Sequence, residues 1–179
     1  MDGRTFLPLL KGETQDQRDT VFKVYSENAA GGREPMRAIE STQFLYIFNP
    51  CSNGKRAMFS ATNDTKTYQR MSQLAQDDPK MAARMEVLKH RTLEEFYDIQ
   101  KDPDCLVNLI SDPAYQTEIE RYRGMLEQQL RKLHDPMLAT LVDRDDPAVL
   151  DAYMRGQQEL IEERQKWIRA IQAKMQKSG

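Results

Sequence analysis

The sequence predicts an α+β fold, in which a small antiparallel sheet of about four strands packs against one long helix. The first observation is a set of short segments rich in β-branched and aromatic residues, a composition typical of strands: residues 20–25, 36–40, 43–48 and 95–99. The second is residues 113–134, where apolar side chains recur at steps of three and four and form one helix face. Such a stripe is suited to burial against a flat sheet. Additional helices are expected within 65–90 and 147–177.

The chain enters the sheet after an apolar segment at residues 5–10, which we expect to form a short helix ended by Gly12. Only residues 41–42 separate the second and third strand segments, a length typical of a β-hairpin. In the third segment the aromatic residues alternate with Leu45 and Ile47, so both faces are apolar. We therefore expect this strand to be central and covered on each side.

Capping residues mark the helices that follow. Asp78 and Pro79 are expected to begin the second helix within 65–90, and Asp112 is expected to cap the long helix. The turn after the fourth strand is expected to present Leu106 and Leu109 inward.

The last helix, 147–177, has a narrower apolar face, in which Tyr153, Leu160 and Trp167 are seven residues apart. This spacing suits either of two arrangements. The helix would pack back on the domain, or it would reach another chain, and the sequence leaves both open.

Composition excludes several classes of protein. Charged residues make up 30% of the 179 residues and the formal net charge is −2, so no global attraction to nucleic acid or membranes is expected. The two cysteines, Cys51 and Cys105, have no metal-ligand spacing with each other or with His90 and His134. Free thiols are expected, although an exported protein would allow a Cys51–Cys105 disulfide.

Four collinear stretches carry a family resemblance. They are Asp2–Gly12; Arg18–Phe22 with Glu27-Asn28; Pro35–Ile39 with Phe44–Asn49; and Phe96-Tyr97-Asp98 with Asp102-Pro103, Asn108-Leu109 and, after the long helix, His134-Asp135-Pro136. Together they resemble the C-terminal region of sulfatases, which hydrolyse sulfate esters and sulfamates. The Pro-Met-Arg and His-Asp-Pro motifs look closest to the N-sulfoglucosamine sulfohydrolase (heparan N-sulfatase, sulfamidase) branch. The resemblance implies a sulfatase-like C-terminal subdomain at 1–136, followed by a helical extension at 137–179.

The catalytic machinery of the family has no counterpart in this chain. Sulfatases resemble one another in a formylglycine nucleophile, made from the first residue of Cys-x-Pro/Ala-x-Arg, and in a divalent cation, usually calcium. Cys51 is followed by Ser-Asn-Gly-Lys and Cys105 by Leu-Val-Asn-Leu, so neither matches. The resemblance thus implies that formylglycine and calcium belong to a catalytic part preceding Met1, and that this chain contains no catalytic or metal-binding residue.

One group of residues is a candidate for substrate binding. Glu27 and Asn28 at a strand end and Arg37 in the next strand are expected to converge on one rim, which the resemblance places beside the active-site cleft. Arg37 would bind a carboxylate or sulfate with two hydrogen bonds, and Glu27 would accept hydrogen bonds from sugar hydroxyls. The alternative is a structural ion pair of Arg37 with Glu27 or Glu40.

The leading functional hypothesis is therefore the C-terminal portion of a sulfatase acting on a sulfated glycan such as a glycosaminoglycan, inactive without its catalytic part. Its partners would be the missing catalytic domain and, through it, the sulfated sugar, with no nucleic acid or membrane. The family implies an exported protein, whether periplasmic, secreted or lysosomal. The alternative is a non-catalytic helical interaction module, with self-association through 147–177 or through an uncovered sheet face.

Overall fold

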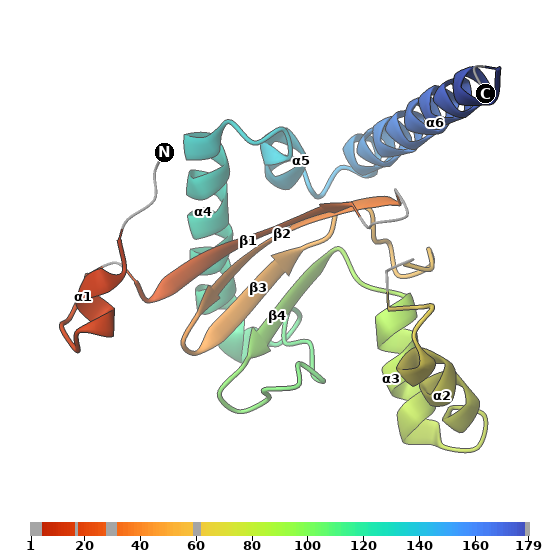
Figure 1. Cartoon of the computed structure of the whole chain (residues 1–179). Helices are drawn as coiled ribbons and strands as arrows, with labels where there is room; N and C mark the ends of the chain where they lie inside the picture. The colour runs from red at the N-terminus through yellow and green to blue at the C-terminus, as the bar shows by residue number, and fades with distance from the viewer. Residues whose placement is uncertain (1–4, 17, 28–31, 59–61, 178–179) are drawn as a thin grey trace.

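The computed structural model of the chain describes residues 5–16, 18–27, 32–58 and 62–177 (Figure 1). Its elements, in chain order, are α1 (Leu7–Leu10), β1 (Thr20–Glu27), β2 (Arg33–Ser41), β3 (Phe44–Phe48), α2 (Lys66–Leu74), α3 (Pro79–Lys89), β4 (Glu94–Asp98), the 3₁₀ turn η1 (Pro113–Tyr115), α4 (Gln116–Leu133), α5 (Leu138–Val142) and α6 (Pro147–Lys177). The four strands form one antiparallel sheet in the order β1-β2-β3-β4. The α+β class and the four predicted strands are confirmed.

The register of the sheet places its bulkiest residues on one face. Tyr46 in β3 lies opposite Ile39 in β2 and Phe96 in β4, and directly paired residues share a face. The rings of Phe44 and Phe96 stack at 5.1 Å, and Tyr122 of α4 meets the Phe96 ring edge-on at 5.5 Å. This aromatic cluster is the centre of the core.

Helix α4 covers this face, as its sequence pattern predicts. Its side chains at steps of three and four are fully buried: Ile119, Tyr122, Leu126 and Leu130. The carboxylate of Asp112 accepts a hydrogen bond of 2.9 Å from the amide of Ala114, so the predicted cap is confirmed. The helix ends where His134 adopts a left-handed conformation, with φ of 51°.

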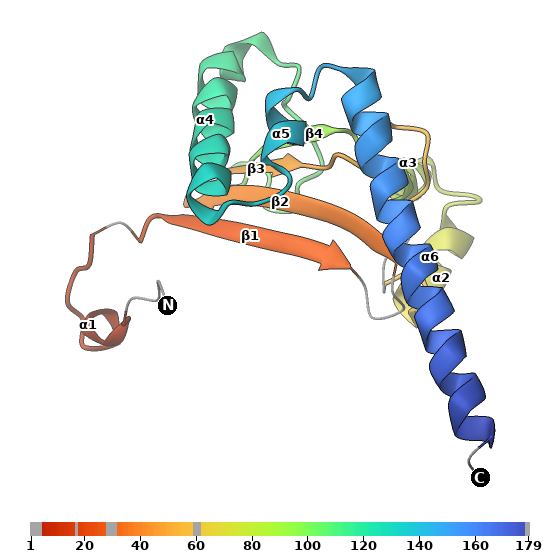
Figure 2. The same cartoon turned by 90° about the horizontal axis from the view of Figure 1, so that it is seen from above.

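The opposite face is different. In Figure 2, α4 and α5 lie on one side of the sheet, and no described helix lies against the other. There Leu45 and Ile47 are only partly buried, and Val21 in β1 is 52% exposed. The expectation that β3 is central is confirmed, because it lies between β2 and β4. Within the described residues the cover on this second side is only partial, because Glu95 and Tyr97 in β4 are buried but Leu45 and Ile47 in β3 are not fully so.

The outer edge of β4 is closed by the loop that follows it. The amide of Phe96 donates to Oδ1 of Asn108 at 2.9 Å, and its carbonyl accepts from the amide of Leu109 at 2.8 Å. Leu109 packs against the core as predicted, but Leu106 is 54% exposed. The inward orientation expected for Leu106 is therefore wrong, because the Asp102 carboxylate holds the amide of Leu106 and directs the turn outward.

The segment after α4 also belongs to the core. Met137 is fully buried and Leu141 of α5 is 2% exposed, so the packing continues beyond residue 136, where the sequence suggested a boundary. α5 itself was not expected, because five residues are too few to establish a helical period.

Helix α6 begins beside the sheet and then leaves it. Its first half contacts β2 and α5. Its second half extends past the end of the β1–β2 hairpin (Figures 1 and 2). Packing back on the domain is thus confirmed for the first half only. Within the described residues, none of the helices is both long enough and apolar enough to cross a membrane.

Candidate functional site

Glu27 lies at the last position of β1, where it binds two cations. Its Oε2 accepts from Nη1 of Arg33 at 2.8 Å, and its Oε1 accepts from Nη1 of Arg164 in α6 at 2.9 Å. The pKa of Glu27 lies below its ordinary value, since partial desolvation, which acts to raise it, is outweighed by the charges and hydrogen bonds of Arg164 and Arg33. Glu27 is therefore a carboxylate at neutral pH and connects the sheet to α6.

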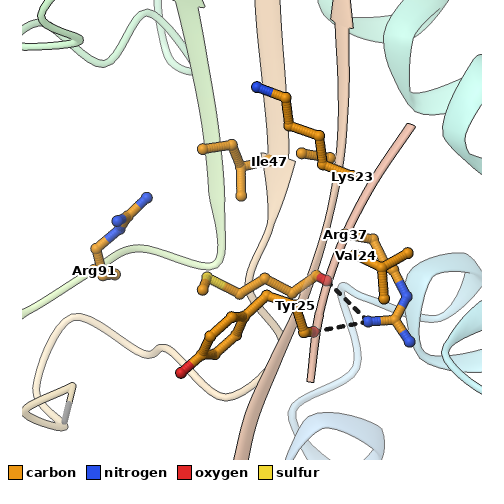
Figure 3. A pocket seen from close by; sticks show the side chains of 8 residues that line it. Lys23, Val24, Tyr25, Arg37, Ile47 and Arg91 are labelled. Carbon is orange, nitrogen blue, oxygen red and sulfur yellow. Dashed lines mark hydrogen bonds between the residues drawn. The ribbon is translucent and has the colours of Figure 1, made fainter. Parts of the chain in front are cut away.

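Arg37 lies one strand away and is 7% exposed. Its Nε donates to Oδ2 of Asp135 at 2.8 Å, and its Nη1 donates to the carbonyls of Tyr25 and Met36, both at 2.9 Å. Figure 3 shows these two carbonyl contacts, with the guanidinium turned away from Ile47 and Arg91. The predicted rim is thus only partly assembled, because the described contacts of Arg37 lead to Asp135 and not to Glu27.

The two structural alternatives considered for Arg37 are both incorrect. Glu40 pairs with Lys23 across the β1–β2 register, and Glu27 pairs with Arg33 at the start of β2 and with Arg164 in α6. The actual partner is Asp135, which the sequence singled out only as part of the His134-Asp135-Pro136 motif. Asn28, the third predicted residue, lies outside the described residues.

The Arg37–Asp135 pair joins two of the motifs that carry the sulfatase resemblance. Arg37 belongs to Pro-Met-Arg and Asp135 to His-Asp-Pro, which are 98 positions apart in the chain. Both side chains are less than a tenth exposed, so the pair lies in a region of low dielectric where an unpaired charge is costly. The pair attaches the end of α4 to the sheet.

A second polar cluster lies on the uncovered side of the sheet, around Glu95. This carboxylate is 2% exposed and accepts two hydrogen bonds of 2.6 Å from the guanidinium of Arg91. The Glu95 carboxylate also accepts hydrogen bonds from the side-chain amide of Asn49 and from the hydroxyl of Tyr97, both at 2.7 Å. Burial raises the pKa of Tyr97 and the neighbouring Glu95 charge adds to this, so the hydroxyl stays protonated and acts as a donor. Asn49 and Tyr97 are again motif residues, here connecting β3 to β4.

A shallow hollow on the uncovered face has a volume of about 240 Å³ (Figure 3). Most of its lining is apolar or aromatic, with Tyr25, Met36, Ala38 and Ile47 among its residues. The cations Lys23 and Arg91 flank it, but each already binds a carboxylate, Glu40 and Glu95 respectively. The hollow is therefore better suited to an apolar side chain of a covering part than to an anionic ligand.

The described residues offer little for catalysis. Burial raises the pKa of the Cys51 thiol to about 11, so it is protonated and a weak nucleophile at neutral pH. Both cysteines are free, as the sequence predicts. In the described ranges, no group of three or more His, Cys, Asp or Glu side chains is arranged to hold a metal ion.

Comparison with known proteins gives one relative by sequence. No family model matches the chain. The chain is 28% identical over 125 residues to an ulvan-active sulfatase from Formosa agariphila. The match covers 68% of this chain and 22% of the relative. The chain therefore spans about a fifth of the length of the curated relative that it matches.

Two solved structures are similar with a TM-score of 0.47 and 19% identity, each match covering 83% of this chain and 24% of the other. One is a 2-O GAG sulfatase, and the other is a protein from Bacteroides thetaiotaomicron assigned to the sulfatases. A TM-score below 0.5 is too low to establish a common fold. The similarity to sulfatases is therefore supported by the sequence relative, over part of the length of such an enzyme.

Proposed function

We propose that this chain is the C-terminal portion of a sulfatase that hydrolyses sulfate ester or sulfamate groups on a sulfated glycan. The observation that carries the proposal is the match to an ulvan-active sulfatase over 125 residues, which spans only 22% of that enzyme. The catalytic part would then lie in the remainder. Formylglycine and calcium would belong to that part, and the chain alone would be inactive.

The uncovered sheet face supports this role. On the face away from α4, Val21 in β1 is 52% exposed and Leu45 and Ile47 in β3 are only partly buried, which is unfavourable in water. A catalytic domain packed there would bury this face. The chain would stabilise the catalytic domain and complete one wall of its cleft.

The rim at the end of β1 is the part of the chain that we propose reaches the substrate. Glu27 is exposed and would accept hydrogen bonds from sugar hydroxyls, with Asn28 beside it. Arg37, whose guanidinium already binds Asp135 and two carbonyls, would act by holding this strand end in place. The Pro-Met-Arg and His-Asp-Pro motifs favour the N-sulfoglucosamine sulfohydrolase branch, and the family favours an exported protein.

An activity comparison tests the proposal. The chain alone and the full open reading frame that contains it are each incubated with an aryl sulfate and with N-sulfoglucosamine. We expect turnover from the full product only, together with a Cys-x-Pro/Ala-x-Arg motif upstream of residue 1. Turnover by the chain alone, or a full product that has neither the motif nor activity, would overturn the proposal.

Two variants of the full product test the rim. Glu27→Ala removes an exposed carboxylate. We therefore expect the ratio of aryl sulfate turnover to N-sulfoglucosamine turnover to change, with little loss of stability. Arg37→Ala leaves the buried Asp135 carboxylate without its counter-charge, so we expect lower stability with an unchanged ratio in the protein that folds. An unchanged ratio in Glu27→Ala would exclude Glu27 from the substrate rim.

A further inference from the structure

The second half of α6 has an apolar stripe that the rest of the described chain does not cover. Two series spaced by seven residues run along adjacent positions of the helix: Tyr153, Leu160 and Trp167, and Met154, Ile161, Ile168 and Met175. In the second half these side chains are exposed, with Trp167 at 65%, Met175 at 70%, Leu160 at 46% and Ile168 at 37%. Large apolar side chains that are adjacent on one helix face are typical of a docking surface.

This stripe continues an interface that already exists. In the first half of α6, Tyr153 packs against the core and Gln157 accepts a hydrogen bond of 3.0 Å from Arg33. Arg164 makes the last described contact of the helix with the sheet, at Glu27. Beyond Arg164 the same helix face leaves the body, as Figure 2 shows. The apolar pattern therefore extends farther than the surface it contacts within this chain.

Charge along the second half of α6 is segregated. The acids Glu159, Glu162 and Glu163 all precede Arg164, and every charged residue from there to the helix end is basic. If two copies of this helix pair in parallel, like charges lie side by side and repel. If they pair in antiparallel orientation, the acidic turn of each copy lies beside the basic turns of the other. The charge pattern thus selects both the partner and its direction.

We propose that residues 160–175 of α6 form an antiparallel helix pair with the same segment of a second copy of this chain. The two helices cross between Gln165 and Lys166, so that Leu160 of one copy lies near Ile171 of the other. The paired segment is short, about 24 Å at 1.5 Å per residue, so the association is weak and depends on concentration. This inference does not rest on a sulfatase function, because it concerns residues beyond the resemblance.

The first experiment measures the mass of the full chain by analytical ultracentrifugation over a range of concentrations. We expect a monomer–dimer equilibrium that shifts to at least tenfold higher concentration in Trp167→Glu. Val107→Glu is the matched control, since Val107 is 61% exposed on a loop far from α6, and it should associate like the wild type. Circular dichroism confirms that each variant keeps its helix content.

The second experiment tests direction by disulfide cross-linking in a Cys105→Ser background. Leu160→Cys and Ile171→Cys chains are oxidised separately and then as a mixture. We expect the mixed pair to cross-link at least tenfold faster than either variant alone.

Three results would overturn the proposal. The first is a wild-type chain that stays monomeric throughout, including one that binds vesicles of anionic lipid instead. The second is unchanged association of Trp167→Glu, which would assign the contact to the sheet face. The third is cross-linking of Leu160→Cys with itself as fast as in the mixture, which would indicate a parallel pair.

Discussion

The two faces of β3 are both apolar, yet only one of them is fully covered. On the α4 side, Tyr46, Phe48 and Phe96 have no exposed surface. On the other side, Leu45 and Ile47 alternate with these residues along the same strand and are only partly buried. Strand sequences with two apolar faces are typical of strands covered on both sides. The described residues therefore cover the second face of β3 less completely than the first.

The first prediction compares one large side chain from each face. Phe96→Ala removes a ring that stacks on Phe44 and contacts Tyr122, so we expect the free energy of unfolding to fall by about 4 kcal/mol. Leu45→Ala on this second face should cost less, about 1.5 kcal/mol, because this side chain is only partly buried. Urea unfolding of both variants measures the difference. Equal losses of unfolding free energy in the two variants would mean that the second face is buried in solution, for example by self-association.

The second prediction compares one ion pair from each face. Asp135→Asn leaves the buried Arg37 cation without its counter-charge, so we expect a loss of about 3 kcal/mol. Glu40→Gln breaks the more exposed pair with Lys23 on the uncovered face and should cost less than about 1 kcal/mol. Thermal unfolding of the two variants at the same pH provides the measurement. If Asp135→Asn were as stable as the wild type, the pair would not hold α4 to the sheet.

The third prediction concerns acid stability on the covered side. Burial acts to raise the pKa of Glu94, but hydrogen bonds from Arg123 and Tyr46 and the arginine charges outweigh it, so the folded pKa lies below 4.5. Because the folded pKa is lowered, the stabilisation is complete above pH 4.5 and is lost as the pH falls through the folded value.

Unfolding free energy measured between pH 7 and pH 3 tests this assignment. We expect Glu94→Gln to lower the stability at pH 7 and to flatten the decline in acid. Glu118→Gln is the control, since that carboxylate pairs with Arg121 on the exposed side of α4. If the unfolding free energy of Glu94→Gln fell between pH 7 and pH 3 as steeply as that of the wild type, the acid sensitivity would belong to other carboxylates.

The sequence could predict the sheet and its main helix because their signals are local. The period-two aromatic pattern of residues 43–48 and the stripe of α4 each fall within one segment, and both were confirmed. The partner of Arg37 depends on where the chain returns after α4, and no local pattern carries that information. Leu106 was misjudged for a similar reason, since its direction is set by the Asp102 carboxylate and not by its own hydrophobicity.

The candidate site was harder to predict than the fold. Several motif residues that carry the resemblance turn out to connect elements: Arg37 with Asp135, and Asn49 with Tyr97 through Glu95. A motif that serves packing and one that serves substrate binding look alike in a single sequence.

The last and smallest effect distinguishes the two thiols without changing stability. Cys51 is 3% exposed at the end of β3, and burial raises its pKa to about 11, so about one molecule in a thousand would carry the thiolate at pH 8. Burial also raises the pKa of Cys105, with the Asp102 charge adding to it, but this thiol is partly exposed.

Iodoacetamide should therefore modify Cys105 at least tenfold faster than Cys51, with unfolding behaviour unchanged by the single modification. Mass spectrometry of tryptic peptides gives both rates, and a urea-unfolded sample, in which the rates should converge, is the control. If Cys51 reacted as fast as Cys105 in the native protein, the sheet end beside Tyr153 would open in solution, and the covered region would be less well packed than its buried side chains indicate.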